Sequence, residues 1–164
     1  MAVSRKKSHK APAGTLGLDN LIMFYDANNI QLSTTVEEVT AENVAMKYEA
    51  WGWKVISING NDVNEIRKAL DEAKAETQRP TLIIGNTIMG KGAMGADKSN
   101  YENKVSTHGQ PLSAAGASIE ETIKNLGGDP QNPFSVFPEV AELYAKRAKE
   151  LEAIVAERYA AKDA

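Results

Sequence analysis

The sequence predicts a protein of the α/β class, in which helices flank a parallel sheet. Three apolar runs of strand length alternate with segments whose apolar residues recur at helical spacing. Two of these runs, near residues 20–26 and 81–85, show little alternation, which is typical of strands buried on both faces of a sheet. Because parallel neighbours need a crossover segment, this order favours a doubly covered sheet built from right-handed crossovers.

The composition excludes several classes of protein. At 164 residues, 42% of them hydrophobic, the chain is long enough for one domain with a sizeable core. A net charge of -3 argues against a nucleic-acid-binding protein. The lack of cysteine excludes disulfides, thiolate metal sites and a cysteine nucleophile, and it fits a cytoplasmic protein. No apolar run reaches the length of a membrane span and no signal-peptide core is visible, so we expect no membrane partner.

The first third of the chain contains two predicted strands and one predicted helix. Residues 1–13 lack apolar periodicity and are rich in cations, so we expect a disordered basic tail. The first strand follows at about 20–26. A helix is expected to begin near Thr40 and to end at Gly52, where glycine can adopt the left-handed conformation of a helix cap. The β-branched run 53–58 is the second predicted strand.

The next unit contains the clearest helix and the third strand. Asp62 is well placed to cap a helix over 63–77, in which an apolar stripe is opposite a charged face. Pro80 then opens the strand 81–85, which is apolar without alternation.

Beyond the third strand the predicted structure becomes less regular. A long polar loop runs to about residue 109, and a loop of that length is usually functional or disordered. We expect a helix over 113–126 and a last helix that begins near Pro138 and frays after Tyr159. The predicted organisation is a tail over 1–13, an α/β domain over 14–136 and a C-terminal helix over 137–164 that leads to a following domain.

Polar residues gather where a ligand of a parallel sheet is expected, beyond the carboxyl ends of the strands. Asn28, with the backbone of Ile30, follows the first strand and offers oxygen ligands suited to Mg²⁺. The loop with Gly90 follows the third strand, where glycine amides can approach phosphate, and His108 ends that loop. Ordinary turns and a flexible loop remain open as alternatives. The residues alone indicate an α/β domain that binds a phosphorylated ligand with Mg²⁺.

Five motifs in succession carry a resemblance to a known family. They are Tyr25-Asp26-Ala27-Asn28-Asn29-Ile30-Gln31-Leu32, Lys47-Tyr48-Glu49-Ala50-Trp51-Gly52-Trp53, Pro80-Thr81-Leu82-Ile83, Met89-Gly90-Lys91-Gly92 and Ser106-Thr107-His108-Gly109-Gln110-Pro111-Leu112. In this order they resemble transketolase over about residues 13–160. The part resembled is the second half of the N-terminal domain, so the fold implied is a partial thiamine-diphosphate-binding fold.

The resemblance implies roles for particular residues. Asn28 takes the place of the asparagine that binds metal and diphosphate, and the carbonyl of Ile30 completes the Mg²⁺ shell. His108 matches the catalytic histidine that contacts the diphosphate and the substrate side of thiamine diphosphate. Leu32 and Met89 stand where apolar residues flank the thiazolium ring. Gly90, beside Met89, is expected to bind the cofactor as well.

The departures from the family pattern are as informative as the matches. The Gly-Asp-Gly metal motif, the earlier histidines and the pyrimidine-binding domain with its activating glutamate have no counterpart here. We therefore expect a fragment, an incomplete gene product or one piece of a split enzyme. Without the metal carboxylate, Mg²⁺ has too few protein oxygens for tight binding. The expected partner is a complementary transketolase chain or, as a homodimer, a second copy.

The resemblance implies transfer of a two-carbon ketol unit between sugar phosphates, a ketose donor and an aldose acceptor, in the pentose phosphate pathway. We expect the chain to be inactive on its own. One alternative is a non-catalytic interaction module that pairs through an exposed sheet edge. Another is a close relative such as a dihydroxyacetone synthase, since the residues that select the substrate lie mostly outside this segment.

Overall fold

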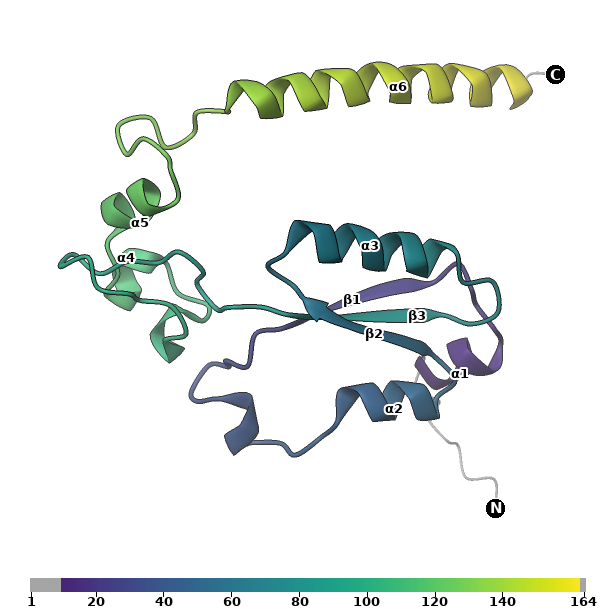
Figure 1. Ribbon diagram of the computed structural model, residues 1–164, viewed down its shortest axis with the longest axis horizontal. Coiled ribbons are helices and arrows are strands. Elements are labelled where there is room, and N and C mark those ends of the chain that lie inside the picture. The colour runs from purple at the N-terminus through teal and green to yellow at the C-terminus, as the bar shows by residue number, and fades with distance from the viewer. Residues whose placement is uncertain (1–9, 163–164) are drawn as a thin grey trace. The chain divides into compact units, whose positions relative to one another are not determined.

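The computed structural model of the chain describes residues 10–162. The chain divides into two compact units, one up to Thr122 and one from Ile123. In the first unit, three described strands form a parallel sheet in the order β1–β3–β2, with α3 on one face and α2 on the other (Figure 1). The predicted parallel sheet flanked by helices is confirmed.

The elements of the first unit are α1 (Lys10–Thr15), β1 (Ile22–Ala27), η1 (Val36–Glu38), α2 (Val44–Ala50), β2 (Lys54–Asn59), α3 (Val63–Lys74), β3 (Thr81–Asn86), η2 (Val105–Thr107) and α4 (Leu112–Ala115). Helix α5 (Ile119–Asn125) crosses the boundary between the units, and α6 (Pro138–Lys162) belongs to the second.

The core of the first unit is built on β3, the central strand. Leu82 and Ile83 are fully buried and point to opposite faces of the sheet, as successive strand residues must. On the α2 face, Leu82 packs in a cluster with Tyr48 and Trp53, whose rings meet edge to face at 5.3 Å. On the α3 face, Ile83 packs against Ala69 and Ala73.

Strand β1 differs from its prediction as a strand buried on both faces. It pairs only with β3 among the described residues, and Phe24 and Tyr25 are 44% and 37% exposed. An apolar run without alternation predicts a central strand, and β3 fits that prediction whereas β1 does not. The run in β1 is equally apolar, but its place at the edge leaves its side chains partly uncovered.

The helix boundaries follow the capping side chains. Helix α2 begins at Val44 instead of near Thr40, because the side chain of Asn43 accepts a hydrogen bond from the Met46 amide at 2.9 Å. Asp62 caps α3 as predicted, by accepting from the amides of Asn64 and Glu65. The helix ends at Lys74, short of the predicted residue 77. Gly52 has the predicted left-handed conformation, with a φ of 81°.

Three other expectations meet a different local structure. Residues 1–9 of the predicted tail lie outside the described residues, whereas 10–13 belong to α1, in which Ala13 is buried in the core. The helix predicted over 113–126 is split into α4 and α5, because Gly116 has a φ of 94°. Helix α6 continues past Tyr159 to Lys162, and none of its described residues is buried. The domain boundaries near residues 13 and 136 stay predictions.

Candidate cofactor site

The loop after β1 is organised by Asn28. Its Oδ1 accepts a hydrogen bond from the Ile30 amide at 3.0 Å, which closes a turn around Asn29, a non-glycine residue with a φ of 58°. Asparagine tolerates this left-handed conformation better than most residues. After this turn, Ile30 is buried, with 7% of its surface exposed.

The backbone of Ile30 points toward the side on which Asn28 lies. Ile30 lies opposite Thr35 in an isolated antiparallel bridge. The hydrogen bonds of this bridge are made by neighbouring residues: the Gln31 amide donates to the Thr34 carbonyl, and the Val36 amide donates to the Asn29 carbonyl. In such a pair, the amide and carbonyl of the central residue point away from the partner. The Ile30 amide meets Asn28 on that side, so its carbonyl projects there as well. Two oxygens, Asn28 Oδ1 and the Ile30 carbonyl, therefore belong to one small surface.

The ends of β1 and β3 are tied together beside this loop. The Thr87 hydroxyl donates to the carboxylate of Asp26, and the Thr87 amide donates to the Ala27 carbonyl at 3.2 Å. From the other side, Asn61 Oδ1 accepts from the Ile88 amide at 2.9 Å. The segment that leads to Met89 is thus held by the end of β1 on one side and by the turn after β2 on the other.

The glycine loop that follows is tightly fixed. Gly90 has a φ of 62°, and a Cβ at this position would lie 3.3 Å from Thr107 Oγ1. The Met89 carbonyl accepts from the Asn103 amide at 2.9 Å. A side chain at Gly90 would therefore strain the backbone and crowd the segment that carries His108.

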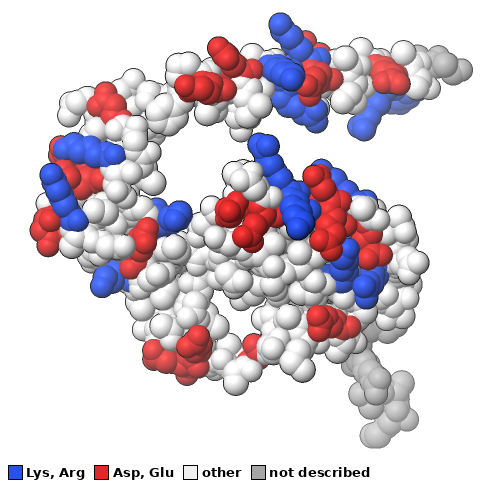
Figure 2. Space-filling model, viewed as in Figure 1, with Lys and Arg blue, Asp and Glu red and all other residues white. Residues whose placement is uncertain are grey.

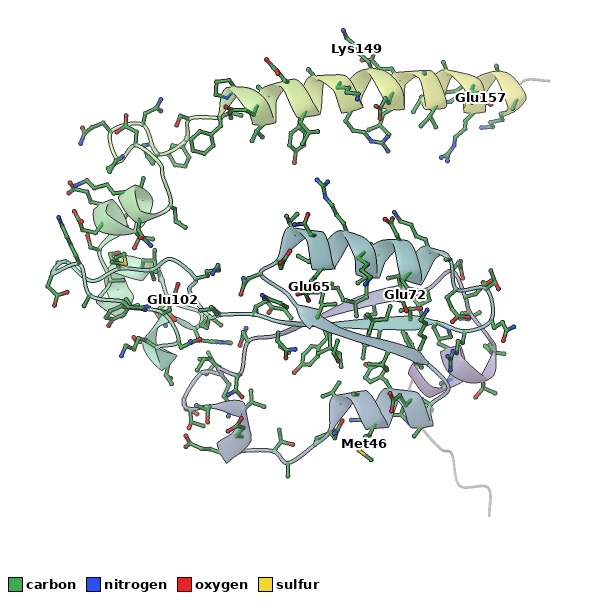
Figure 3. The ribbon with its side chains drawn as sticks, in the orientation of Figure 1. Met46, Glu65, Glu72, Glu102, Lys149 and Glu157 are labelled. Atoms are coloured by element: carbon green, nitrogen blue, oxygen red, sulfur yellow. The ribbon has the colours of Figure 1, made fainter. Side chains whose placement is uncertain are left out.

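One amide of this loop already has an anionic partner. The Gly92 amide donates to Glu102 Oε1 at 2.7 Å, and Glu102 lies in the loop that follows (Figure 3). This bond, together with one from Asn100 and the charge of Lys91, lowers the pKa of Glu102 below its usual value of 4.5. An anion at this loop would have to compete with Glu102 for the Gly92 amide. Sequence reasoning missed Glu102, because nothing in the spacing connects it to Gly92.

His108 carries an unsatisfied nitrogen. It follows η2, and its amide donates to the Val105 carbonyl at 3.0 Å, which fixes the backbone. Its Nδ1 is buried without a hydrogen-bond partner among the described residues. A buried ring nitrogen without a partner is costly unless something else binds it. Because the atom is buried, a ligand group such as a phosphate oxygen reaches it only if the ring or its loop moves.

The three loops lie against one another at the carboxyl ends of β1 and β3. Gly90 adjoins Thr107, and a Cβ on Gly109 would lie 3.5 Å from Leu32 Cδ2, in the loop of Asn28. The loops that carry Asn28, Gly90 and His108 therefore contact one another. Within the described residues, no group of three or more histidine, aspartate or glutamate side chains is arranged to hold a metal. The oxygens of Asn28 and Ile30 suit a hard cation, but they would fill only part of its shell.

No helix in the described part of the chain combines the length and the apolarity that a membrane crossing requires.

The fold places the chain among the α/β proteins with parallel sheets, whose ligands bind beyond the carboxyl ends of the strands. The family model described as "Transketolase, thiamine diphosphate binding domain" matches residues 3–162. The chain belongs to the transketolase family, and the part that it represents is the thiamine-diphosphate-binding domain.

Curated relatives agree with this assignment. The chain is 35% identical over 147 residues to dihydroxyacetone synthase of Pichia angusta, an alignment that covers 88% of the chain and 20% of the relative. It is 38% identical over 135 residues to transketolase of Treponema pallidum, with 82% and 19% covered. The chain thus spans about a fifth of the length of the curated relatives that it matches.

Solved structures show the same fold. Transketolase from Campylobacter jejuni aligns with a TM-score of 0.73 and 35% identity, over 91% of this chain and 22% of that one. Transketolase from Pichia stipitis in complex with sedoheptulose 7-phosphate aligns with a TM-score of 0.79 and 31% identity, over 90% and 21%.

Proposed function

We propose that this chain supplies the part of a transketolase that holds the diphosphate of thiamine diphosphate and its Mg²⁺. The observation that supports the proposal is that the loops of Asn28, Ile30 and His108 contact one another and carry two oxygen donors and a ring nitrogen without a hydrogen-bond partner among the described residues. The family model, a thiamine-diphosphate-binding domain, supports the same cofactor. These residues fit one half of such a site, because oxygen donors suit Mg²⁺ and a histidine ring can donate a hydrogen bond to phosphate.

Each residue has a defined task in this proposal. Asn28 Oδ1 and the Ile30 carbonyl bind Mg²⁺, which shares its remaining positions with diphosphate oxygens. His108 binds the diphosphate and takes part in catalysis on the substrate side of the cofactor. Gly90 lets the loop backbone approach the cofactor, and Met89 borders its ring. When bound, thiamine diphosphate supplies the carbanion chemistry, while the protein orients and tunes it.

The complete enzyme would transfer a two-carbon ketol unit from a ketose phosphate to an aldose phosphate in the cytoplasm, in the pentose phosphate pathway. We propose that the chain by itself is inactive and needs a complementary transketolase chain or a second copy to complete the site. Two protein oxygens leave the metal underliganded, which is the reason for this expectation. Steady turnover of xylulose 5-phosphate with an aldose phosphate by the purified chain alone would contradict it.

The binding proposal is tested by calorimetric titration of the full chain with thiamine diphosphate and Mg²⁺. Asn28→Ala removes the side-chain oxygen, and His108→Ala removes the nitrogen. Ser57→Ala, on the exposed side of β2, is the matched control because it lies away from the three loops. Each site variant is expected to weaken binding about tenfold or more, which corresponds to about 1.4 kcal/mol, whereas the control should bind as the native chain does.

The outcomes distinguish a chain that binds the cofactor by itself from one that shares only the ancestry of the family. Micromolar binding that only the two site variants weaken supports a preformed half-site that a complementary chain could complete. No heat of binding at millimolar cofactor would contradict the proposed function of the isolated chain.

A second candidate function is a non-catalytic interaction module. It is favoured by one observation, the partly exposed edge strand β1, which retains apolar side chains at the surface. Substrate choice between a transketolase and a dihydroxyacetone synthase stays open, since a relative with each name matches the same part of the chain.

A further inference from the structure

His108 lies in a segment, residues 104–117, whose hydrogen bonds are almost all local. We refer to these residues as the His108 segment. Among the described residues, one hydrogen bond connects the segment to a residue outside it. The Tyr101 hydroxyl donates this bond to the Ala115 carbonyl at 2.7 Å. The hydroxyl of Tyr101 therefore supplies the direct polar restraint on the position of the segment.

Ion pairs contribute little to that position. Apart from Lys104 at its start, the His108 segment contains no lysine, arginine, aspartate or glutamate, and Lys104 is exposed. Charged side chains gather elsewhere, for instance over α3 (Figure 2). Exposed charges stabilise a structure only weakly. Packing and the bond from Tyr101 must therefore hold the segment in place.

The two limbs of the segment are held at different points of the first unit. In the first limb, Thr107 is 8% exposed and lies against Gly90, where an added Cβ would be 3.3 Å from Thr107 Oγ1. In the second limb, Ala115 is 8% exposed and ends α4. The last carbonyls of a helix have no partner within the helix, so Tyr101 supplies the one that the Ala115 carbonyl lacks. His108 lies between these two points.

Tyr101 is itself fixed to the glycine loop. Its amide donates to the Ala93 carbonyl at 2.9 Å, and the Ala93 amide donates to the Gly90 carbonyl at 2.9 Å. Ala93 is buried, with 1% of its surface exposed. The side chain of Tyr101 therefore connects the glycine loop to the helix that follows His108.

Gly116 leaves room for the tyrosine hydroxyl. It has a φ of 94°, and a Cβ at this position would lie 2.8 Å from Tyr101 Oη and 3.6 Å from Tyr101 Cζ. The second distance is an ordinary contact between carbon atoms, whereas the first is too short for a carbon and an oxygen. The steric conflict of a side chain at residue 116 would therefore be with the hydroxyl and not with the ring.

We propose that Tyr101 is a positioning residue for His108. Its hydroxyl holds the end of the His108 segment against the glycine loop and thereby fixes His108 relative to Met89 and Gly90. The consequence for the cofactor rests on the proposed function, in which His108 binds the diphosphate. A binding group that is already held in place loses less conformational freedom when the ligand binds, so removal of the hydroxyl weakens binding without removing any contact to the cofactor.

The histidine ring signals in the nuclear magnetic resonance spectrum of the full chain measure this role without cofactor. The chain has two histidines, His9 and His108, so His108→Ala assigns the signals and His9 serves as the internal reference. Tyr101→Phe removes only the hydroxyl. It should shift or broaden the ring signals of His108 and leave those of His9 in place.

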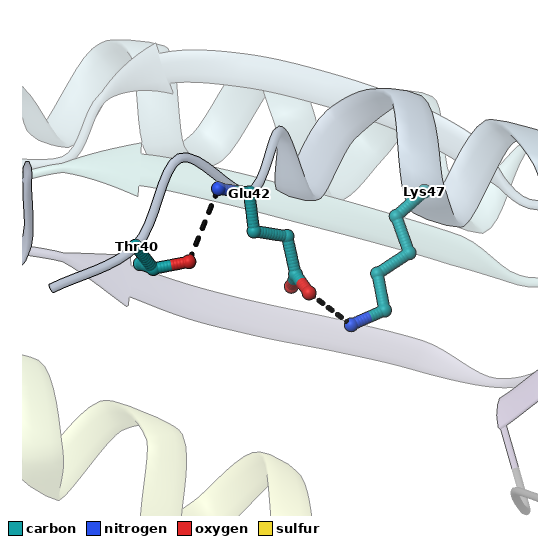
Figure 4. A network of polar contacts seen from close by, with 3 residues as sticks. All are labelled: Thr40, Glu42 and Lys47. Carbon is teal, nitrogen blue, oxygen red and sulfur yellow. Dashed lines mark hydrogen bonds and ion pairs between the residues drawn. The ribbon is translucent and has the colours of Figure 1, made fainter.

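Thr40→Val is the matched control, because it also removes a hydroxyl that forms one hydrogen bond. Thr40 Oγ1 accepts from the Glu42 amide at 3.1 Å before α2, and Glu42 forms an ion pair with Lys47 at 2.6 Å (Figure 4). This variant should leave the His108 signals at their native positions. Circular dichroism checks that the variants are folded.

Gly116→Ala perturbs the same contact from the other side. In the native background its Cβ should displace the tyrosine hydroxyl and move the His108 signals. In the Tyr101→Phe background the Cβ meets only the ring, so it should move the signals little further. The two effects are thus expected to be non-additive, as for residues in contact. Fully additive shifts would contradict the coupling, and if Gly116→Ala does not fold, Tyr101→Phe decides.

Titration with thiamine diphosphate and Mg²⁺ supplies the second readout. Tyr101→Phe should raise the Kd about twofold to tenfold, the range that one hydrogen bond contributes, while Thr40→Val should leave it unchanged. A native chain that does not bind the cofactor contradicts the proposed function, and the ring signals then decide the role of Tyr101. Ring signals of His108 that Tyr101→Phe leaves unmoved overturn the proposal. An unchanged Kd of Tyr101→Phe, in a chain that binds the cofactor, overturns it as well.

Discussion

Thr81 offers a sharp test of the energetics of the core. It lies at the start of the central strand with no exposed surface, and its Oγ1 is buried without a hydrogen-bond partner among the described residues. An unsatisfied buried polar group costs about 1–3 kcal/mol, part of which Thr81→Val recovers because valine has nearly the same shape and lacks the hydroxyl. We expect the free energy of unfolding to rise by about 1 kcal/mol, and the Tm by about 2–4 °C.

The matched control is a second buried threonine whose hydroxyl is used. Thr122 is 5% exposed, and its Oγ1 accepts from the Met94 amide at 3.0 Å. Thr122→Val should lower the free energy of unfolding by about 1–3 kcal/mol, since it leaves that amide without its acceptor. Urea unfolding followed by circular dichroism measures both variants. If Thr81→Val destabilises the protein as much as Thr122→Val does, the reasoning from hydrogen-bond satisfaction is refuted.

Three further substitutions test other parts of the first unit. Glu102→Gln should lower the free energy of unfolding near neutral pH. The hydrogen bond from the Gly92 amide lowers the pKa of Glu102 in the folded chain, so the ionised carboxylate stabilises the native chain above the usual pKa of 4.5. This stabilisation is lost as the pH falls through the lowered pKa. The two urea midpoints should therefore converge in acid, and a gap that is constant with pH would argue against this role. Leu82→Ala, which truncates a side chain with no exposed surface, should cost about 2–5 kcal/mol in urea unfolding. Asp62→Ala should cost about 1 kcal/mol through the lost cap of α3, and no loss of stability would show that the cap is dispensable.

The sequence was sufficient to predict those features that depend on only a few adjacent residues. Gly52 adopts the predicted left-handed conformation, and Asp62 caps the predicted helix, because both depend only on the adjacent backbone. The predicted start of α2 near Thr40 is wrong, and the reason is again local. Asn43 is a competing cap closer to the apolar face, and its side chain reaches the Met46 amide.

The candidate site was predictable only in part. Asn28, Gly90 and His108 could be selected from the sequence because they follow apolar strands or lie in one polar loop, and strand ends of a parallel sheet meet at one edge. Glu102 could not be selected, because its bond to the Gly92 amide joins two points of an irregular loop. Likewise, only the folded chain reveals that Nδ1 of His108 is buried without a hydrogen-bond partner among the described residues.

The sequence by itself determined the succession of strands and helices, the membership of the transketolase family and the residues expected to hold a cofactor. These depend on local patterns and on motifs that are read along the chain. The tertiary structure decided which apolar strand is central and which lies at the edge. The neighbours of an apolar run are not written in the run itself, and its burial depends on them. Strand β3 is enclosed between two strands and two helices, while β1, equally apolar, pairs with β3 alone among the described residues.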